Sequence, residues 1–87
     1  MVDQGSIFKD ERELSVDIFE NGKKIRIIVE LPGVNEEDIR LDLIEDILTV
    51  AASQGNQNYY KNVKLPRPYE GIIGKIFNNG ILEVTLN

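Results

Sequence analysis

Gly74-Lys75-Ile76-Phe77-Asn78-Asn79-Gly80-Ile81-Leu82-Glu83-Val84-Thr85-Leu86-Asn87 is the stretch that decides the fold. Two apolar runs flank Asn79-Gly80, and Asn-Gly is the strongest short-range signal of a tight hairpin because both residues tolerate positive φ. After the turn, Leu82, Val84 and Leu86 alternate with polar residues. Side chains at alternate positions share one face of a strand, so this stretch predicts a β-hairpin with one apolar face.

The same period-two alternation recurs along the rest of the chain. Strands are predicted at about residues 14–18, 25–31, 39–43, 47–52, 59–65 and from 72 or 73, divided by Asn21-Gly22, Pro32-Gly33 and Glu45-Asp46. Residues 53–58 are predicted to form a polar loop. Asn35 is a good N-cap for a single helical turn at Glu36-Glu37-Asp38. About seven short strands with regularly spaced turn signals predict an all-β antiparallel sandwich or small barrel.

Composition limits the classes of function. The chain has 87 residues, a net charge of −5 and neither cysteine nor histidine. Disulfides, thiolate or imidazole metal sites, thiol nucleophiles and histidine-based triads are therefore excluded. We expect residues 1–13 to form a flexible N-terminal arm and residues 14–87 to form one domain. We expect no membrane segment, because no run approaches the roughly 18 apolar residues that span a bilayer.

The remaining polar clusters have ordinary structural explanations. The carboxylates of Glu36-Glu37-Asp38 and Glu45-Asp46 fall in predicted turns, where they stay solvated, so we predict neither catalysis nor a metal or cofactor site. Tyr59 and Tyr60 could stack on single-stranded nucleic acid. The acidic net charge favours the alternative, in which one tyrosine packs inward and the other covers the sheet; we therefore expect no nucleic-acid partner.

One apolar set is larger than a single inner face needs. It lies on two predicted strands and comprises Ile39, Leu41, Leu43, Ile44, Ile72, Ile73, Ile76 and Phe77. Most of these residues could be core. Alternatively, some could line an exposed apolar groove or sheet edge, which would mark a binding site.

Several motifs in order resemble the α-crystallin domain of small heat-shock proteins, from about Leu14 to Leu86. They are Val29-Glu30-Leu31-Pro32-Gly33-Val34, Glu36-Glu37-Asp38-Ile39, Leu48-Thr49-Val50, Leu65-Pro66 and Phe77-Asn78-Asn79-Gly80-Ile81-Leu82-Glu83-Val84. The resemblance implies an immunoglobulin-like β-sandwich that holds unfolding client proteins without ATP, in the cytoplasm and in stress, and that self-associates. The runner-up interpretation is a CS-type co-chaperone or adaptor module that binds one folded partner.

The resemblance also implies a groove between the strand near residues 39–43 and the strand near residues 73–77. In the family this groove receives an isoleucine-x-isoleucine segment from a neighbouring chain. The candidate peptide-binding residues here are Ile39, Leu41, Leu43, Ile73 and Lys75.

Three features depart from the family pattern. The excursion that family members commonly swap between subunits is reduced to residues 53–58, and the sequence carries no isoleucine-x-isoleucine extension. Lys75 stands where the groove strand usually has alanine, or Gly74 does if that strand bulges. We therefore expect this chain to be a monomer or an edge-paired dimer rather than a large cage, with Lys75 narrowing the mouth of the groove.

Overall fold

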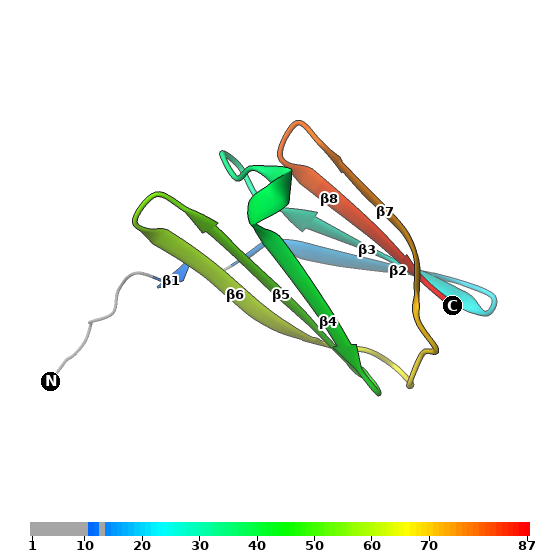
Figure 1. Ribbon diagram of the computed structural model, residues 1–87. Coiled ribbons are helices and arrows are strands. Elements are labelled where there is room, and N and C mark those ends of the chain that lie inside the picture. The colour runs from blue at the N-terminus through cyan, green and yellow to red at the C-terminus, as the bar shows by residue number, and fades with distance from the viewer. Residues whose placement is uncertain (1–10, 13) are drawn as a thin grey trace, which may run out of the picture.

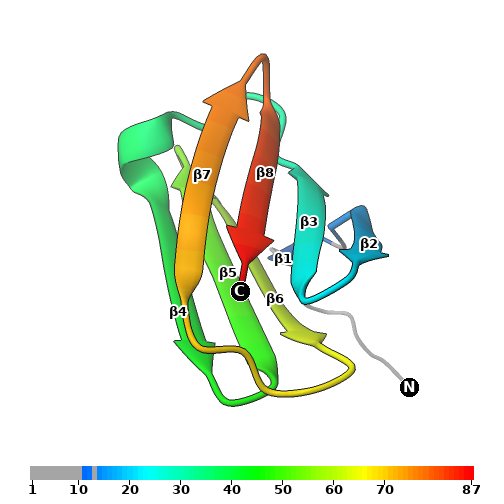
Figure 2. The same cartoon turned by 90° about the vertical axis from the view of Figure 1, so that its right-hand side faces the viewer.

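Two four-stranded sheets face each other in a β-sandwich in the computed structural model, which describes residues 11, 12 and 14–87 (Figures 1 and 2). The strand order is β1-β6-β5-β4 in sheet A and β2-β3-β8-β7 in sheet B. The strands are β1 (Glu11–Arg12), β2 (Val16–Asn21), β3 (Lys24–Glu30), β4 (Ile39–Ile44), β5 (Ile47–Gln54), β6 (Gln57–Lys64), β7 (Ile72–Asn78) and β8 (Ile81–Leu86). The predicted all-β sandwich is confirmed, with the two-residue β1 added to the seven expected strands.

Tight turns set the register of the two hairpins in sheet B. Asn79 and Gly80 have φ values of 53° and 79°, and Asn78 pairs with Ile81 across the turn. Gly22, with a φ of 64°, closes the β2–β3 hairpin, in which Asn21 pairs with Lys24. Both hairpins predicted from Asn-Gly are confirmed.

The core lies between the inner faces of the two sheets. Its members come from every strand from β3 to β8 except the edge strand β7, and from the connecting loops. They are Leu14, Ile25, Ile27, Val29, Leu31, Val34, Ile39, Leu48, Val50, Ala52, Tyr59, Val63, Leu65, Tyr69, Leu82, Val84 and Leu86. Along β3, β5 and β8 these residues alternate with more exposed ones, as expected when one face of each sheet is buried and the other faces water.

The connection from β3 to β4 crosses one end of the sandwich. The backbone N–H of Leu31 donates to the carbonyl of Gly80 at 2.7 Å, which ties this connection to the β7–β8 turn. Gly33 has a φ of 81°, as expected for the turn after Pro32. A single 3-10 turn, η2 (Glu36–Asp38), follows; Asn35 occupies its N-cap position but its side chain makes no capping hydrogen bond.

The predicted loop over residues 53–58 is wrong. Strand β5 continues to Gln54 and β6 begins at Gln57, so Gly55 and Asn56 alone make the turn, with Gly55 at a φ of 59°. The strand ends are polar because most of their side chains are exposed to water rather than packed in the core. Backbone pairing does not require apolar side chains, so the polar composition concealed the extension.

Most of the arm predicted over residues 1–13 lies outside the described residues. Within it, Glu11 and Arg12 pair in parallel with Asn58 and Tyr59 of β6. In the described part of the chain, no helix is long and apolar enough to cross a membrane.

Strands β4 and β7 are the last strands of their sheets, and they lie on the same side of the sandwich (Figure 2). Each has a hydrogen-bonded neighbour on one side only, β5 for β4 and β8 for β7. Within residues 11, 12 and 14–87, the other edge of each strand therefore presents unpaired backbone groups. This side is where the sequence predicts a groove.

Candidate functional site

The inner face of β4 carries three of the predicted groove residues. Ile39, Leu41 and Leu43 lie directly opposite Ala52, Val50 and Leu48 of β5, all of which are buried. Residues directly opposite each other share a face, so all three face the other sheet. Ile39 is buried in the core, whereas Leu41 and Leu43 are half-buried and pack against it.

The inner face of β7 can be assigned in the same way from β8. Phe77, Lys75 and Ile72 pair with Leu82, Val84 and Leu86, which are fully buried. The side chains of these three β7 residues therefore leave the backbone on the face that is directed toward sheet A. Phe77 is half-buried against the core, while Lys75 and Ile72 are exposed.

Ile73, the other predicted groove residue on β7, falls at an irregularity. The register shifts between Ile72 and Gly74, so that Ile72 rather than Ile73 lies opposite Leu86. Ile73 is 53% exposed. Sequence reasoning missed Ile72 and Phe77 as inward-facing residues of this strand; counting back from the Asn79-Gly80 turn would have found Phe77, and Gly74 was the only hint of a bulge.

The irregularity lies before Gly74, and pairing is continuous from Gly74 to the turn. Lys75 therefore lies opposite Val84 and on the inward face of β7. Strands β4 and β7, which carry the predicted groove residues, lie on the same side of the sandwich (Figure 2). The groove itself remains a prediction.

The charges on this side are separated by face. Arg40 and Asp42 of β4 alternate with the inward-facing residues and are exposed on the outer face, opposite Ala51 and Thr49. Lys75 is thus the one charged residue among the inward-facing residues of β4 and β7.

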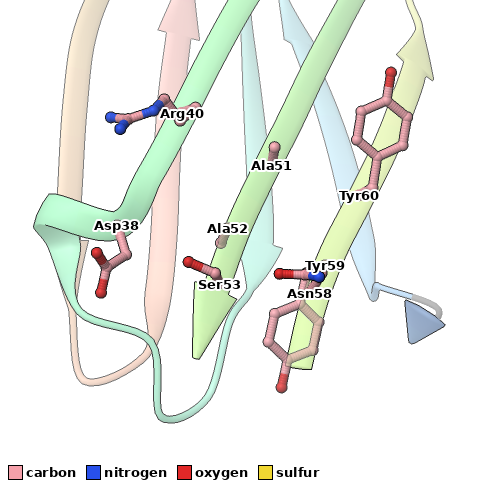
Figure 3. A pocket seen from close by; sticks show the side chains of 8 residues that line it. All are labelled: Asp38, Arg40, Ala51, Ala52, Ser53, Asn58, Tyr59 and Tyr60. Atoms are coloured by element: carbon pink, nitrogen blue, oxygen red, sulfur yellow. The ribbon is translucent and has the colours of Figure 1, made fainter. Parts of the chain in front are cut away.

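A separate hollow of about 400 Å³ lies near one end of sheet A (Figure 3). Arg40 from β4 and Tyr60 from β6 stand on either side of Ala51 from β5, and these three residues form one cross-strand row. Its lining is Asp38, Arg40, Ala51, Ala52, Ser53, Asn58, Tyr59 and Tyr60. The lining combines one acidic, one basic and several neutral polar side chains with two alanines. This mixture does not favour any one class of ligand.

The two adjacent tyrosines divide between inside and outside. Tyr59 is buried in the core and Tyr60 is 52% exposed. This confirms the interpretation that one ring packs inward while the other covers the sheet. Among the described residues, no three acidic, histidine or cysteine side chains gather as a metal site would require.

One ion pair fixes the β4–β5 turn to the end of β6. Lys64 Nζ lies 2.8 Å from Asp46 Oδ2, and the backbone N–H of Leu65 donates to the carbonyl of Asp46 at 2.7 Å. The hydrogen bond from Lys64 holds the pKa of Asp46 below its ordinary value of 3.8. The carboxylate serves the turn structurally, which accords with the solvated role predicted for this acidic pair.

Comparisons with known proteins find small heat shock proteins similar to this chain. No protein-family model matches it. It is 32% identical to the small heat shock protein hspI, mitochondrial, of Dictyostelium discoideum, over 79% of this chain and 40% of that protein. It is 30% identical to small heat shock protein C2 of Rickettsia felis, over 80% of this chain and 56% of that protein. The chain therefore spans about half the length of these relatives.

A solved structure agrees in fold. Heat shock protein 16.0 from Schizosaccharomyces pombe superimposes with a TM-score of 0.77 at 27% identity, covering 87% of this chain and 66% of that one. Sequence similarity and fold point to the same family. The resemblance to the α-crystallin domain of small heat-shock proteins, inferred from the sequence, is confirmed.

Proposed function

We propose that this homologue of the small heat shock proteins is a holdase domain, which binds partly unfolded proteins without ATP and keeps them from aggregating. The observation that carries the proposal is the side of the sandwich formed by β4 and β7. Two strand edges there have no neighbouring strand among the described residues, and β7 presents the exposed side chains of Ile72 and Ile73. Unpaired backbone groups beside apolar side chains suit an extended, partly unfolded segment.

We place the peptide contact on Ile39, Leu41, Leu43, Ile73 and Lys75, with Ile72 and Phe77 added from the register of β7. An extended segment lying along either free edge can form backbone hydrogen bonds while its alternate side chains enter the space between the sheets. Leu41 and Leu43 retain partial exposure and are the residues of β4 best able to receive them. Ile39 is buried, so it is the least accessible of the three inward-facing residues of β4.

Binding of this kind involves no covalent step, so the proposal includes no enzymatic activity and no cofactor. The partners are unfolded client proteins and a second copy of the chain. We propose the cytoplasm as the location; of the relatives, the Dictyostelium protein is named as mitochondrial. For this chain alone we propose a monomer or an edge-paired dimer, because β5 and β6 are joined by a two-residue turn that leaves no long excursion to exchange.

The decisive test is light scattering of several unrelated proteins heated with and without the chain, in the absence of ATP. Suppression of aggregation of all of them supports a holdase. Suppression confined to one protein favours the adaptor alternative, and suppression of none overturns the proposal.

Two matched variants connect the activity to the proposed surface. Ile72→Ser and Ile76→Ser each remove one exposed isoleucine from β7, but Ile72 lies opposite the buried Leu86 whereas Ile76 lies opposite Glu83 on the outer face. We expect Ile72→Ser to weaken suppression more than Ile76→Ser. Equal loss in both variants would mean that general surface hydrophobicity, rather than the β4/β7 side, carries the activity.

The assembly state is checked separately by multi-angle light scattering of this chain. We expect the mass of one or two subunits. A stable particle of roughly twelve or more subunits would refute the edge-pairing proposal.

A further inference from the structure

We infer that the β4/β7 side selects extended segments carrying an acidic residue between two apolar ones, and that Lys75 is the residue that sets this preference. The inference rests on the proposed function, because it needs peptides to bind along this side. It goes beyond that function by naming the chemistry of the preferred ligand.

The register places a single cation in apolar surroundings. Lys75 pairs with Val84 and so starts on the inward face of β7, between Ile72 and Phe77 on the same face. Across from this strand, the inward-facing residues of β4 are aliphatic. A bound segment would therefore meet apolar side chains and one charge.

The side chain of Lys75 does not block the space between the two sheets. Its side chain is exposed, although its paired neighbour Val84 is fully buried. A lysine in this situation lays its alkyl stem along apolar surface and keeps its ammonium group in water. The ammonium then stands at the water-facing mouth, while the stem adds to the apolar wall.

The geometry of an extended ligand brings its middle residue to that mouth. Side chains of a strand alternate, so when two apolar residues point in between the sheets the residue between them points out. No described residue forms an ion pair with Lys75, so its ammonium is open to a ligand carboxylate. An acidic middle residue gains a charge-assisted hydrogen bond there. A neutral middle residue only displaces water, and a basic one is repelled.

The charge of the whole chain opposes this preference. With a net charge of −5, the protein as a whole repels an acidic ligand. Any preference for acid must therefore arise from a local cation. Strand β4 carries Arg40, but this residue stands on the outer face opposite Ala51, which makes Arg40→Gln a matched control for loss of one positive charge.

The experiment measures binding of three fluorescent peptides that differ at one position, by anisotropy with the 87-residue chain. Each peptide is a short polar frame around isoleucine-x-isoleucine, with glutamate, glutamine or lysine at x. Because exposed ion pairs are modest, we expect the glutamate peptide to bind about threefold to fivefold more tightly than the glutamine peptide at low salt, and less so at high salt. The lysine peptide should bind most weakly.

Three variants assign the preference. Lys75→Gln should equalise the glutamate and glutamine peptides while retaining binding of the glutamine peptide, and Lys75→Glu should reverse the order so that the lysine peptide binds best. Arg40→Gln should keep the wild-type order. A wild-type protein that does not discriminate between the peptides, or a preference that survives Lys75→Gln, overturns the inference while leaving peptide binding intact. Failure of all three peptides to bind instead overturns the proposed β4/β7 site, whatever the outcome of the aggregation assay.

Discussion

Gly33→Val should destabilise the domain, because Gly33 has a φ of 81°. An ordinary L-residue in the left-handed region costs about 1–2 kcal/mol, and β-branched valine lies at the upper end. A Cβ at this position would also lie 2.6 Å from Nε2 of Gln54, so the glutamine side chain must move, which disturbs the hydrogen bond that its Oε1 accepts from the Tyr59 hydroxyl. We therefore expect a loss of about 2 kcal/mol, which for a domain of this size lowers the melting temperature by about 8–16 °C.

Thermal and urea unfolding followed by circular dichroism measures this loss, and Gly22→Val separates its two causes. Gly22 has a φ of 64°, but a Cβ there would meet nothing within 4 Å, so Gly22→Val reports the backbone strain alone. Gly33→Val should be the more damaging of the two, and Gln54→Ala in the Gly33→Val background should recover the difference. An unchanged melting temperature for Gly33→Val would refute the strain argument, and equal losses at Gly22 and Gly33 would refute the contribution of Gln54.

Three other substitutions test particular features by equilibrium unfolding, peptide binding or NMR. Leu41→Glu should abolish binding of isoleucine-x-isoleucine peptides and leave a folded domain, because Leu41 keeps partial access to water. The control is Val50→Glu at the fully buried cross-strand partner of Leu41, which should unfold the protein. Unfolding by Leu41→Glu would show that Leu41 belongs to the core. Glu45→Gly should stabilise the protein by about 1 kcal/mol, because Glu45 has a φ of 55° in the β4–β5 turn; a lower urea midpoint would contradict this. Lys64→Gln should raise the NMR-measured pKa of Asp46 toward 3.8. A folded-state pKa below the unfolded value stabilises the protein above the unfolded pKa, and this stability is lost as the pH falls through the folded pKa. The variant should therefore be less stable than the wild type at neutral pH and equally stable in acid. An unshifted Asp46 pKa would show that Lys64 is not the cause.

Local patterns predicted most of the fold because each strand buries one face. Alternation identified Ile25, Ile27 and Val29 as one buried set, and they are fully buried. Asn-Gly pairs located two hairpins because positive φ is a local requirement. The β5–β6 hairpin was missed because its ends are polar, and polarity reports exposure rather than backbone pairing.

The candidate site was harder to predict because it depends on register and on the stacking of sheets. Alternation placed Ile39, Leu41 and Leu43 on one face of β4, which the pairing with β5 reproduces. The shift between Ile72 and Gly74 could not be predicted from the sequence, because a single glycine in a strand is compatible with a bulge or with regular pairing. That β4 and β7 occupy the same side of the sandwich follows from strand order in both sheets, which no local pattern specifies.

The position of Lys75 also bears on how an exposed apolar edge remains soluble. In the described part of the chain, β7 combines an edge that has no neighbouring strand with exposed Ile72, Ile73 and Ile76, a combination that promotes strand-to-strand aggregation between copies of the chain. A charge on the inward face of an edge strand opposes such pairing, because an identical strand docking on it would bring two lysines into an apolar space without a counter-charge. An acidic ligand removes that penalty, whereas a second β7 doubles it. One residue can thus disfavour self-association along β7 and favour an acidic segment from another protein, and Lys75→Ala should reveal the first effect as faster self-aggregation on heating.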